Sequence, residues 1–207
     1  MDGDFVMKLL LFSDLHCSRQ AAQELVVRSK DVDVLVGAGD FATCRRGVEI
    51  TIDVLKQTAM PAVLVPGNSE SAEELAAACQ DWSQTHVLHG SGCTIDGVSF
   101  FGIGGGIPVT PFGAWSYDFT EEEATELLKD CPKKCVLVSH SPPQGMLDMS
   151  SDGQHLGSTA VRATIKRCKP MLVVCGHIHN CGGQQGNMED SPVVNAGPQG
   201  IEWKIER

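Results

Sequence analysis

The sequence predicts an α/β fold, built as one domain over residues 1–207. Two observations predict it: apolar, β-rich runs recur along the chain, and amphipathic segments separate them. The runs are KLLLF, VDVLV, AVLV, CVLV and MLVV, and their near-continuous apolar character indicates strands buried on both faces. With 42% hydrophobic residues, the chain can form a sizeable core.

Helices are expected between the runs, near residues 19–29, 47–58, 71–79 and 158–168. Two pairs have the three-residue spacing of a capping box, in which side chain and backbone cap each other at a helix start. These pairs are Ser71 with Glu74 and Thr120 with Glu123. The alternation of strand and helix is typical of layered α/β proteins.

Two segments indicate additional antiparallel strands. A hairpin is expected around Asp96-Gly97, followed by a glycine-rich loop. Residues 191–206 read as two strands around a turn, so the fold has either one mixed sheet or a second sheet. At the other end, Met7 begins the first strand, and residues 1–6 are expected to be a short extension.

The composition argues against several classes of function. A net charge of −10 repels phosphate backbones, so stable nucleic-acid binding is not expected, whereas a small phosphate-bearing substrate is compatible. No apolar run approaches the roughly 18–20 residues that cross a bilayer, and the acidic start MDGDFV lacks the basic region of a secretory signal. Most of the nine cysteines, which include no CxxC pair, are expected to be reduced, small core residues in the cytoplasm. Disulfide stapling is the disfavoured alternative, since a chain this long does not need it. A homo-oligomer is compatible with the sequence.

Side chains of metal-ligand type follow all five runs. They are Asp14 and His16, Asp40, Asn68, His140, and His177 with His179. Each motif alone is weak, since a Gly-Asp pair is usually a turn and a single histidine is usually a satisfied polar group. Together they predict a ligand site, because the carboxyl ends of strands form the binding edge of open α/β sheets.

Aspartate, asparagine and histidine without cysteine suit borderline divalent metals such as Mn²⁺, Fe²⁺, Zn²⁺, Ni²⁺ or Co²⁺. Seven ligands are too many for one tetrahedral ion and favour two ions about 3.5–4 Å apart with a shared carboxylate. An alternative is a zinc chelate formed by Cys175, His177, His179 and Cys181. Residues two apart on a strand are about 6.5–7 Å from each other, so this alternative requires a sharply curled chain and is disfavoured.

The order DxH, GD, GN, strand-end histidine and GHxH, from Asp14 to Asn195, resembles the calcineurin-like metallophosphoesterase superfamily. The resemblance implies a four-layer α/β/β/α sandwich of two mixed sheets flanked by helices. It implies that one ion is held by Asp14, His16, Asp40 and His179, and the other by Asp40, Asn68, His140 and His177, with Asp40 bridging. The chain length and the GNSE variant are most similar to the compact bacterial and archaeal phosphodiesterases of this superfamily.

The resemblance further implies hydrolysis of a small phosphate ester by a hydroxide that bridges two metal ions, for which Mn²⁺ is expected. With that hydroxide, the two ions and two aspartates leave a pocket charge of about +1, which suits a singly charged phosphodiester. The alternatives are a phosphomonoesterase of the same fold and a metal-binding scaffold without activity. The presence of all seven ligands favours chemistry.

The fuller superfamily motif has a histidine after the asparagine, to assist the leaving group, and this chain has Ser69 there. A serine hydroxyl does not titrate near neutral pH and cannot act as that acid. We therefore predict a catalyst suited to good leaving groups, with Glu70 orienting the loop. His155 is a candidate proton donor from another loop, or else a polar residue that precedes a helix. The candidate catalytic set is Asp40, Asn68, Ser69, His140 and His155.

Two further elements are candidates for substrate contact. Arg45 and Arg46 follow Asp40, as a phosphate-binding arginine does in the related Ser/Thr phosphatases, although the spacing here is longer. The alternative is a solvated charged loop. In the glycine-rich loop, Phe112 or Trp115 is expected near the substrate mouth, or else packed on the core.

Overall fold

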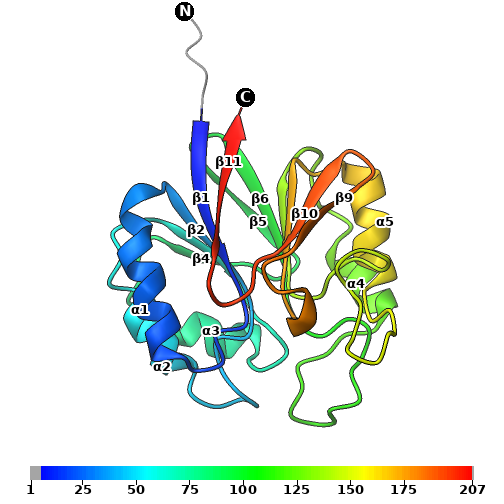
Figure 1. Cartoon of the computed structure of the whole chain (residues 1–207), viewed down its shortest axis with the longest axis horizontal. Coiled ribbons are helices and arrows are strands. Elements are labelled where there is room, and N and C mark those ends of the chain that lie inside the picture. The colour runs from blue at the N-terminus through cyan, green and yellow to red at the C-terminus, as the bar shows by residue number, and fades with distance from the viewer. Residues whose placement is uncertain (1–5, 207) are drawn as a thin grey trace, which may run out of the picture.

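The computed structural model describes residues 6–206 and shows two mixed β-sheets facing each other between two layers of helices (Figure 1). The first sheet contains, in spatial order, β11 (Ile201–Glu206), β1 (Val6–Phe12), β2 (Val34–Ala38), β3 (Ala62–Val65) and β4 (Thr85–Val87). The second contains β5 (Ser91–Ile95), β6 (Val98–Ile103), β7 (Val136–Ser139), β8 (Leu172–Cys175), β10 (Ser191–Asn195) and β9 (Gln185–Met188). The expected four-layer sandwich is confirmed.

The apolar runs are buried on both faces because side chains alternate across each strand. On β1, Leu9 and Leu11 lie in the core between the two sheets, whereas Leu10 and Phe12 face the outer helices. The same alternation recurs on the second sheet. The continuous apolar character of the strands therefore follows from the two covered faces.

Five α-helices cover the outer faces within the described part of the chain. α1 (Arg19–Arg28), α2 (Val48–Leu55) and α3 (Ala72–Ala78) pack on the first sheet, and α4 (Glu121–Leu127) and α5 (Thr159–Cys168) pack on the second. The four expected helices are confirmed, although α2 ends at Leu55, three residues earlier than expected. Both capping boxes are present, at the starts of α3 and α4. None of the helices in residues 6–206 has the length and apolar character needed to span a bilayer.

The hairpin around Asp96-Gly97 is confirmed as β5–β6, with Ile95 paired to Val98. Both turn residues have positive φ, 45° and 77°, as a two-residue type I′ turn requires. The two expected strands in residues 191–206 also exist, but they do not pair with each other. β10 pairs with β8 in one sheet and β11 with β1 in the other, so the turn between them carries the chain across the sandwich.

β1 begins at Val6, so the last residue of the expected extension belongs to the strand, and residues 1–5 lie outside the described part. Six of the nine cysteines are buried, as expected for small core residues.

Candidate metal centre

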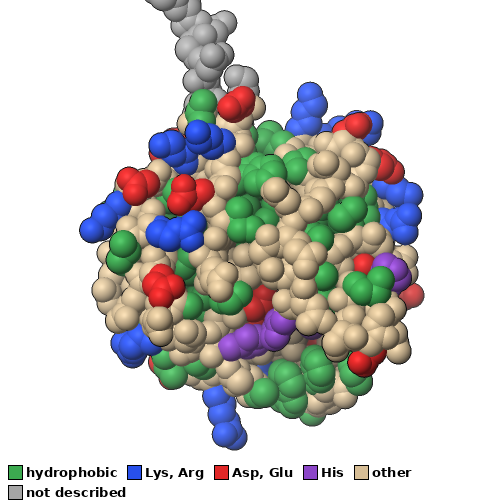
Figure 2. Space-filling model, viewed as in Figure 1, with side chains coloured by type: hydrophobic (Ala, Val, Ile, Leu, Met, Phe, Trp, Pro, Cys, Tyr) green, Lys and Arg blue, Asp and Glu red, His purple; other side chains and the backbone are tan. Residues whose placement is uncertain are grey.

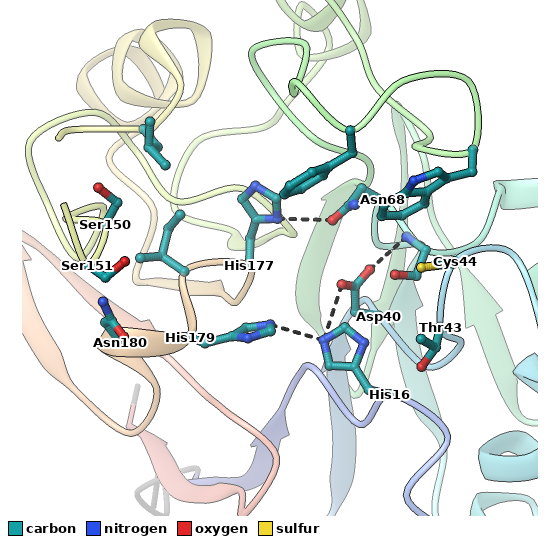
Figure 3. Close-up of a pocket in the computed structure, with 15 residues that line it drawn as sticks. His16, Asp40, Thr43, Cys44, Asn68, Ser150, Ser151, His177, His179 and Asn180 are labelled. Atoms are coloured by element: carbon teal, nitrogen blue, oxygen red, sulfur yellow. Dashed lines mark hydrogen bonds and ion pairs between the residues drawn. The ribbon is translucent and has the colours of Figure 1, made fainter.

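Five loops, after β1, β2, β3, β7 and β8, bring their polar side chains to one place between the two sheets. Three of these strands belong to the first sheet and two to the second. The site therefore lies where the carboxyl ends of both sheets meet, and Figure 3 shows side chains from both sheets turned toward each other.

The first group of side chains contains Asp14, His16, Asp40 and His179, whose ligand-type atoms all lie within 4.8 Å of one another. Nε2 of His16 lies 3.0 Å from Nε2 of His179 and 3.6 Å from Oδ2 of Asp40. Nε2 of His179 lies 3.6 Å from Oδ1 of Asp14. Two imidazoles and two carboxylates converging in this way form a donor set that suits a divalent ion.

The second group shares Asp40 with the first. Nε2 of His140 lies 3.5 Å from Oδ1 of Asp40 and 3.2 Å from Oδ1 of Asn68. Nδ1 of His177 lies 3.1 Å from the same oxygen of Asn68. The two carboxylate oxygens of Asp40 thus face different groups of ligand-type atoms.

The two aspartates are buried, and their charge needs compensation. Among residues 6–206, the ion pairs of Asp14 and Asp40 are made with histidines, and no lysine or arginine pairs with either carboxylate. A buried carboxylate without a fixed cation is costly, so this arrangement fits bound metal ions.

Asp14 and His177 are tuned toward their ligand forms. Burial alone would raise the pKa of Asp14, but hydrogen bonding to His179 and the nearby His140 lower it to about 2. Burial, reinforced by His140, lowers the pKa of His177 to about 4. At neutral pH, Asp14 is therefore ionised and His177 neutral, as metal coordination requires.

The loops hold these residues in unusual backbone conformations. Asp14, His16, Asp40 and His177 all have positive φ, at 57°, 44°, 58° and 66°. Such strain costs about 1–3 kcal/mol per residue and persists only where surrounding contacts enforce it. One such contact is the 3.0 Å hydrogen bond from the backbone N–H of His177 to Oδ1 of Asp14. Close approach also explains Gly67, because a Cβ there would collide with Oδ1 of Asp40.

The buried side chain of Glu70 hydrogen-bonds to the backbone of two loops that carry candidate ligands. One carboxylate oxygen accepts hydrogen bonds from the backbone N–H groups of Asp40 and Gly67, at 2.9 and 2.7 Å. The other accepts one from Ala42 at 2.9 Å. Burial and the nearby Asp40 raise the pKa of Glu70 to about 7. The side chain therefore positions the loops after β2 and β3, as expected.

Several of the candidate ligand residues line a cavity of about 410 Å³. Its walls include His16, Asp40, Asn68, Ser69, His177 and His179 on one part, and Phe112, Trp115, Leu156 and Ile178 on another. Phe112 and Trp115 thus lie at the cavity, as expected for the glycine-rich loop.

The alternative zinc chelate of Cys175, His177, His179 and Cys181 is not supported, because the cluster around His179 within residues 6–206 contains no cysteine.

The sequence profile of the calcineurin-like phosphoesterase family matches residues 7–181. The chain belongs to this family. A curated relative, UPF0046 protein K07C11.7 of Caenorhabditis elegans, is 31% identical over 206 residues, covering 90% of this chain and 68% of the relative.

Two solved structures show the same fold as this chain. TT1561 of Thermus thermophilus has a TM-score of 0.73 at 20% identity, covering 94% of this chain and 91% of its own. A dimetal phosphatase from Danio rerio has a TM-score of 0.63 at 12% identity, and the match covers 91% of this chain and 86% of the phosphatase chain. Family membership and the Asp/His cluster together identify a metallophosphoesterase fold with a candidate site for divalent metals.

Two predicted substrate contacts, Arg45 and Arg46, lie outside the cavity walls. The Nε of Arg45 is paired with Oε2 of Glu74 at 2.8 Å, and its guanidinium carbon lies 6.0 Å from the centre of the Tyr117 ring. Arg46 does not line the cavity either. The role of both arginines in binding phosphate stays a prediction.

The predicted proton donor, His155, also lies beside the cavity rather than in its wall. Its Nδ1 lies 2.7 Å from Oδ1 of the buried Asp148, and its side chain is 53% exposed. The neighbouring Leu156 does line the cavity. Aspartate holds the ring in one orientation, and its role as an acid stays a prediction.

Sequence reasoning missed the side chains that hold Asn68. Its Nδ2 donates a hydrogen bond to Oγ of Ser116 at 3.1 Å, and that hydroxyl donates to Oδ1 of Asp118 at 2.7 Å. The backbone N–H of Tyr117 donates to the carbonyl of Asn68 at 2.9 Å. The only signal in the sequence was the cluster of Thr, Ser and Asp residues inside the glycine-rich loop.

Proposed function

We propose that this protein is a hydrolase with two divalent metal ions, Mn²⁺ favoured, that cleaves phosphodiesters. The observation that carries the proposal is the position of Asp40, whose Oδ2 faces His16 at 3.6 Å and whose Oδ1 faces His140 at 3.5 Å. A carboxylate that faces two separate sets of ligand atoms is suited to bridge two ions.

The residues divide into two ligand sets. One is Asp14, His16, Asp40 and His179, and the other is Asp40, Asn68, His140 and His177. Ions bound there would supply a nucleophilic hydroxide near neutral pH and would neutralise the phosphoryl oxygens. A protein of the same fold is named a dimetal phosphatase, which supports the two-ion assignment.

The chain's own residues hold this arrangement in place. Glu70 positions the backbone around Asp40, and Ser116 orients the amide of Asn68. The backbone N–H of Ser69 donates to Oδ1 of Asp40 at 2.8 Å. These contacts keep the ligand atoms close before any ion binds, which reduces the reorganisation that binding requires.

The preference for diesters rests on charge. The cavity walls in residues 6–206 contain no lysine or arginine, so the ions would be its only strong cations. A diester carries one negative charge and a monoester about two near neutral pH, because the second phosphate pKa is about 6. A site with a small net positive charge therefore matches the diester better.

The decisive experiment compares two esters of one leaving group. The purified protein is stripped with a chelator, reloaded with Mn²⁺ and assayed with bis(p-nitrophenyl) phosphate and p-nitrophenyl phosphate. We expect a higher kcat/KM for the diester. His140→Asn should abolish hydrolysis, whereas the exposed His86→Asn should not change it. A higher kcat/KM for the monoester would make the protein a phosphomonoesterase, and two bound ions without hydrolysis would make it a scaffold.

A further inference from the structure

One wall of the cavity is aromatic. The rings of Phe112 and Trp115 are stacked, with centroids 5.4 Å apart and planes inclined by 14°, and the Phe112 residue is 51% exposed. Figure 2 shows hydrophobic side chains gathered directly beside the histidines on this face. Exposed apolar side chains that gather at a cavity mark a binding surface, because their hydration is unfavourable in the free protein.

This wall belongs to the same cavity as the candidate metal ligands. His177 and His179 line one part of it, and Leu156 and Ile178 add apolar surface alongside the aromatic pair. A phosphoryl group held at the ligands would therefore place its organic substituent in an apolar, partly aromatic space.

The ends of the loop segment that carries Phe112 and Trp115 are tied together and to the candidate ligand Asn68. The hydroxyl oxygens of Thr110 and Ser116, which flank the two aromatic residues in sequence, lie 3.0 Å apart, and both hydroxyls donate to the carboxylate of Asp118. Oδ2 of Asp118 accepts from the hydroxyl and the backbone N–H of Thr110, at 2.7 and 2.9 Å. Ser116 in turn accepts from the Asn68 amide. A binding surface held in place before the ligand arrives loses little affinity to ordering.

We propose that Phe112 and Trp115 bind the organic group of the phosphate ester and select esters that carry a planar aromatic ring. The inference rests on the proposed function of the same site and names its substrate class. A flat ring gains by stacking on the exposed aromatic face, which a small alkyl group cannot do. The absence of lysine and arginine from the described cavity walls argues against a second phosphate group on the substrate.

The test measures binding without turnover. Titration calorimetry of the Mn²⁺-loaded protein compares methyl(phenyl)phosphinate with dimethylphosphinate, which carry one negative charge like a diester and have no P–O–C bond to hydrolyse. In the first of these the ring lies directly on phosphorus. A second pair compares the P-methylphosphinate analogues of adenosine 5′-monophosphate and ribose 5-phosphate, in which a CH₂ group replaces the ester oxygen. In the adenosine analogue the nucleobase lies a sugar's length from phosphorus. We expect the ring to increase affinity about tenfold in at least one pair, and the favoured pair identifies the source of the ring.

The variants assign that gain to the wall. Phe112→Ala and Trp115→Ala should each remove most of the ring's advantage, and Phe112→Leu, which keeps apolar volume, should remove part of it. Val109→Ala is the matched control, because Val109 is exposed on the same loop but does not line the cavity. It should leave both pairs unchanged. Bound metal is counted in every variant.

Two outcomes overturn the inference. One is that, in both pairs, the wild-type protein binds the ligand with the ring less than about threefold more tightly than the ligand without it. A failure to bind any of the four ligands counts as this outcome. The other is an advantage that survives in the Phe112→Ala/Trp115→Ala double variant. The proposed function fails separately: if ring selectivity is present and is lost in the variants, but no ester is hydrolysed, the aromatic subsite stands and the activity does not.

Discussion

The backbone N–H of Ser69 donates a 2.8 Å hydrogen bond to Oδ1 of Asp40, at the position where the fuller superfamily motif has a histidine. The bond uses the main chain, so it does not depend on which side chain stands at position 69. Holding the candidate bridging aspartate and supplying a proton are therefore separable tasks at this residue. The first is kept here, and a serine hydroxyl cannot perform the second.

Ser69→His should restore the missing acid. We expect the variant to speed esters with poor leaving groups selectively, because an aryl anion departs without a proton and an alkoxide does not. A well-placed acid gives about 10²–10⁴-fold, and a new imidazole without supporting contacts should give less. The measurement is kcat/KM across a series of leaving groups for wild type and variant, with equal metal content. The dependence on leaving-group pKa should be steep in wild type and shallower in the variant.

A shallow dependence in the wild-type protein would show that another acid already acts. His155 is then the residue to test, since Asp148 orients its ring at 2.7 Å next to the cavity. His155→Asn should steepen the dependence if it supplies the proton. No change would exclude it.

Asp40→Ala should remove both metal ions and abolish activity, because its two oxygens face both ligand sets. His16→Ala should weaken mainly one ion, since it belongs to one set only. Elemental analysis after dialysis measures the difference, with about two ions expected in wild type. Retention of both ions in Asp40→Ala would refute the bridging role.

Stability should depend on pH through His89. This ring packs against Tyr117 and Phe119, with centroids 5.7 and 4.7 Å away, and its Nδ1 accepts a hydrogen bond from the backbone of Gly104 at 3.2 Å. Burial lowers the pKa of His89 below its ordinary 6.5. The unfolded chain therefore binds the proton more readily, so stability is present above pH 6.5 and is lost as the pH falls toward the lowered value.

His89→Gln should remove that contribution. In chelator-treated protein, where metal loss plays no part, the Tm of wild type should fall more between pH 7 and pH 5 than the Tm of the variant. Calorimetry measures both, and the histidines of the metal site contribute equally to each. An equal fall in the two proteins would mean that His89 binds its proton as readily in the folded state.

The candidate site was predictable from sequence because each ligand follows directly after a buried apolar run. The order of residues along the sequence is enough to place Asp40 or His140 at the end of a strand. The carboxyl ends of strands lie close together in layered α/β folds. The division of these strands between two sheets was not readable from the runs, because β2 and β7 are equally buried on both faces. Only the resemblance to a known family supplied it.

The parts that were missed lack a local pattern. β9 is short and largely polar, with the sequence QGNM, so no apolar alternation marks it as a strand. The partner of Asn68, Ser116, lies 48 residues away in an irregular loop. A contact of that kind is made by the tertiary fold, and neither residue type nor spacing predicts it.

Ser116 should therefore act as a positioning residue for Asn68. Its Oγ accepts the Nδ2–H of Asn68 at 3.1 Å, which turns the amide oxygen toward His140 and His177 at 3.2 and 3.1 Å. Without that bond the amide could rotate and present its nitrogen, which cannot ligate a metal. Ser116→Ala should weaken one of the two ions about 10–100-fold, as removal of an outer contact to a metal ligand typically does.

Metal titration of the stripped protein distinguishes this role from a general loss of structure. Ser116→Ala should keep full affinity for the ion held by the set that lacks Asn68, and Ser116→Thr, which keeps the hydroxyl, should restore the weakened ion. Ser83→Ala, at an exposed serine in the turn before β4, is the matched control and should bind both ions normally. Equal weakening of both ions in Ser116→Ala, or failure of Ser116→Thr to restore binding, would show that the hydroxyl supports the loop as a whole and does not orient Asn68.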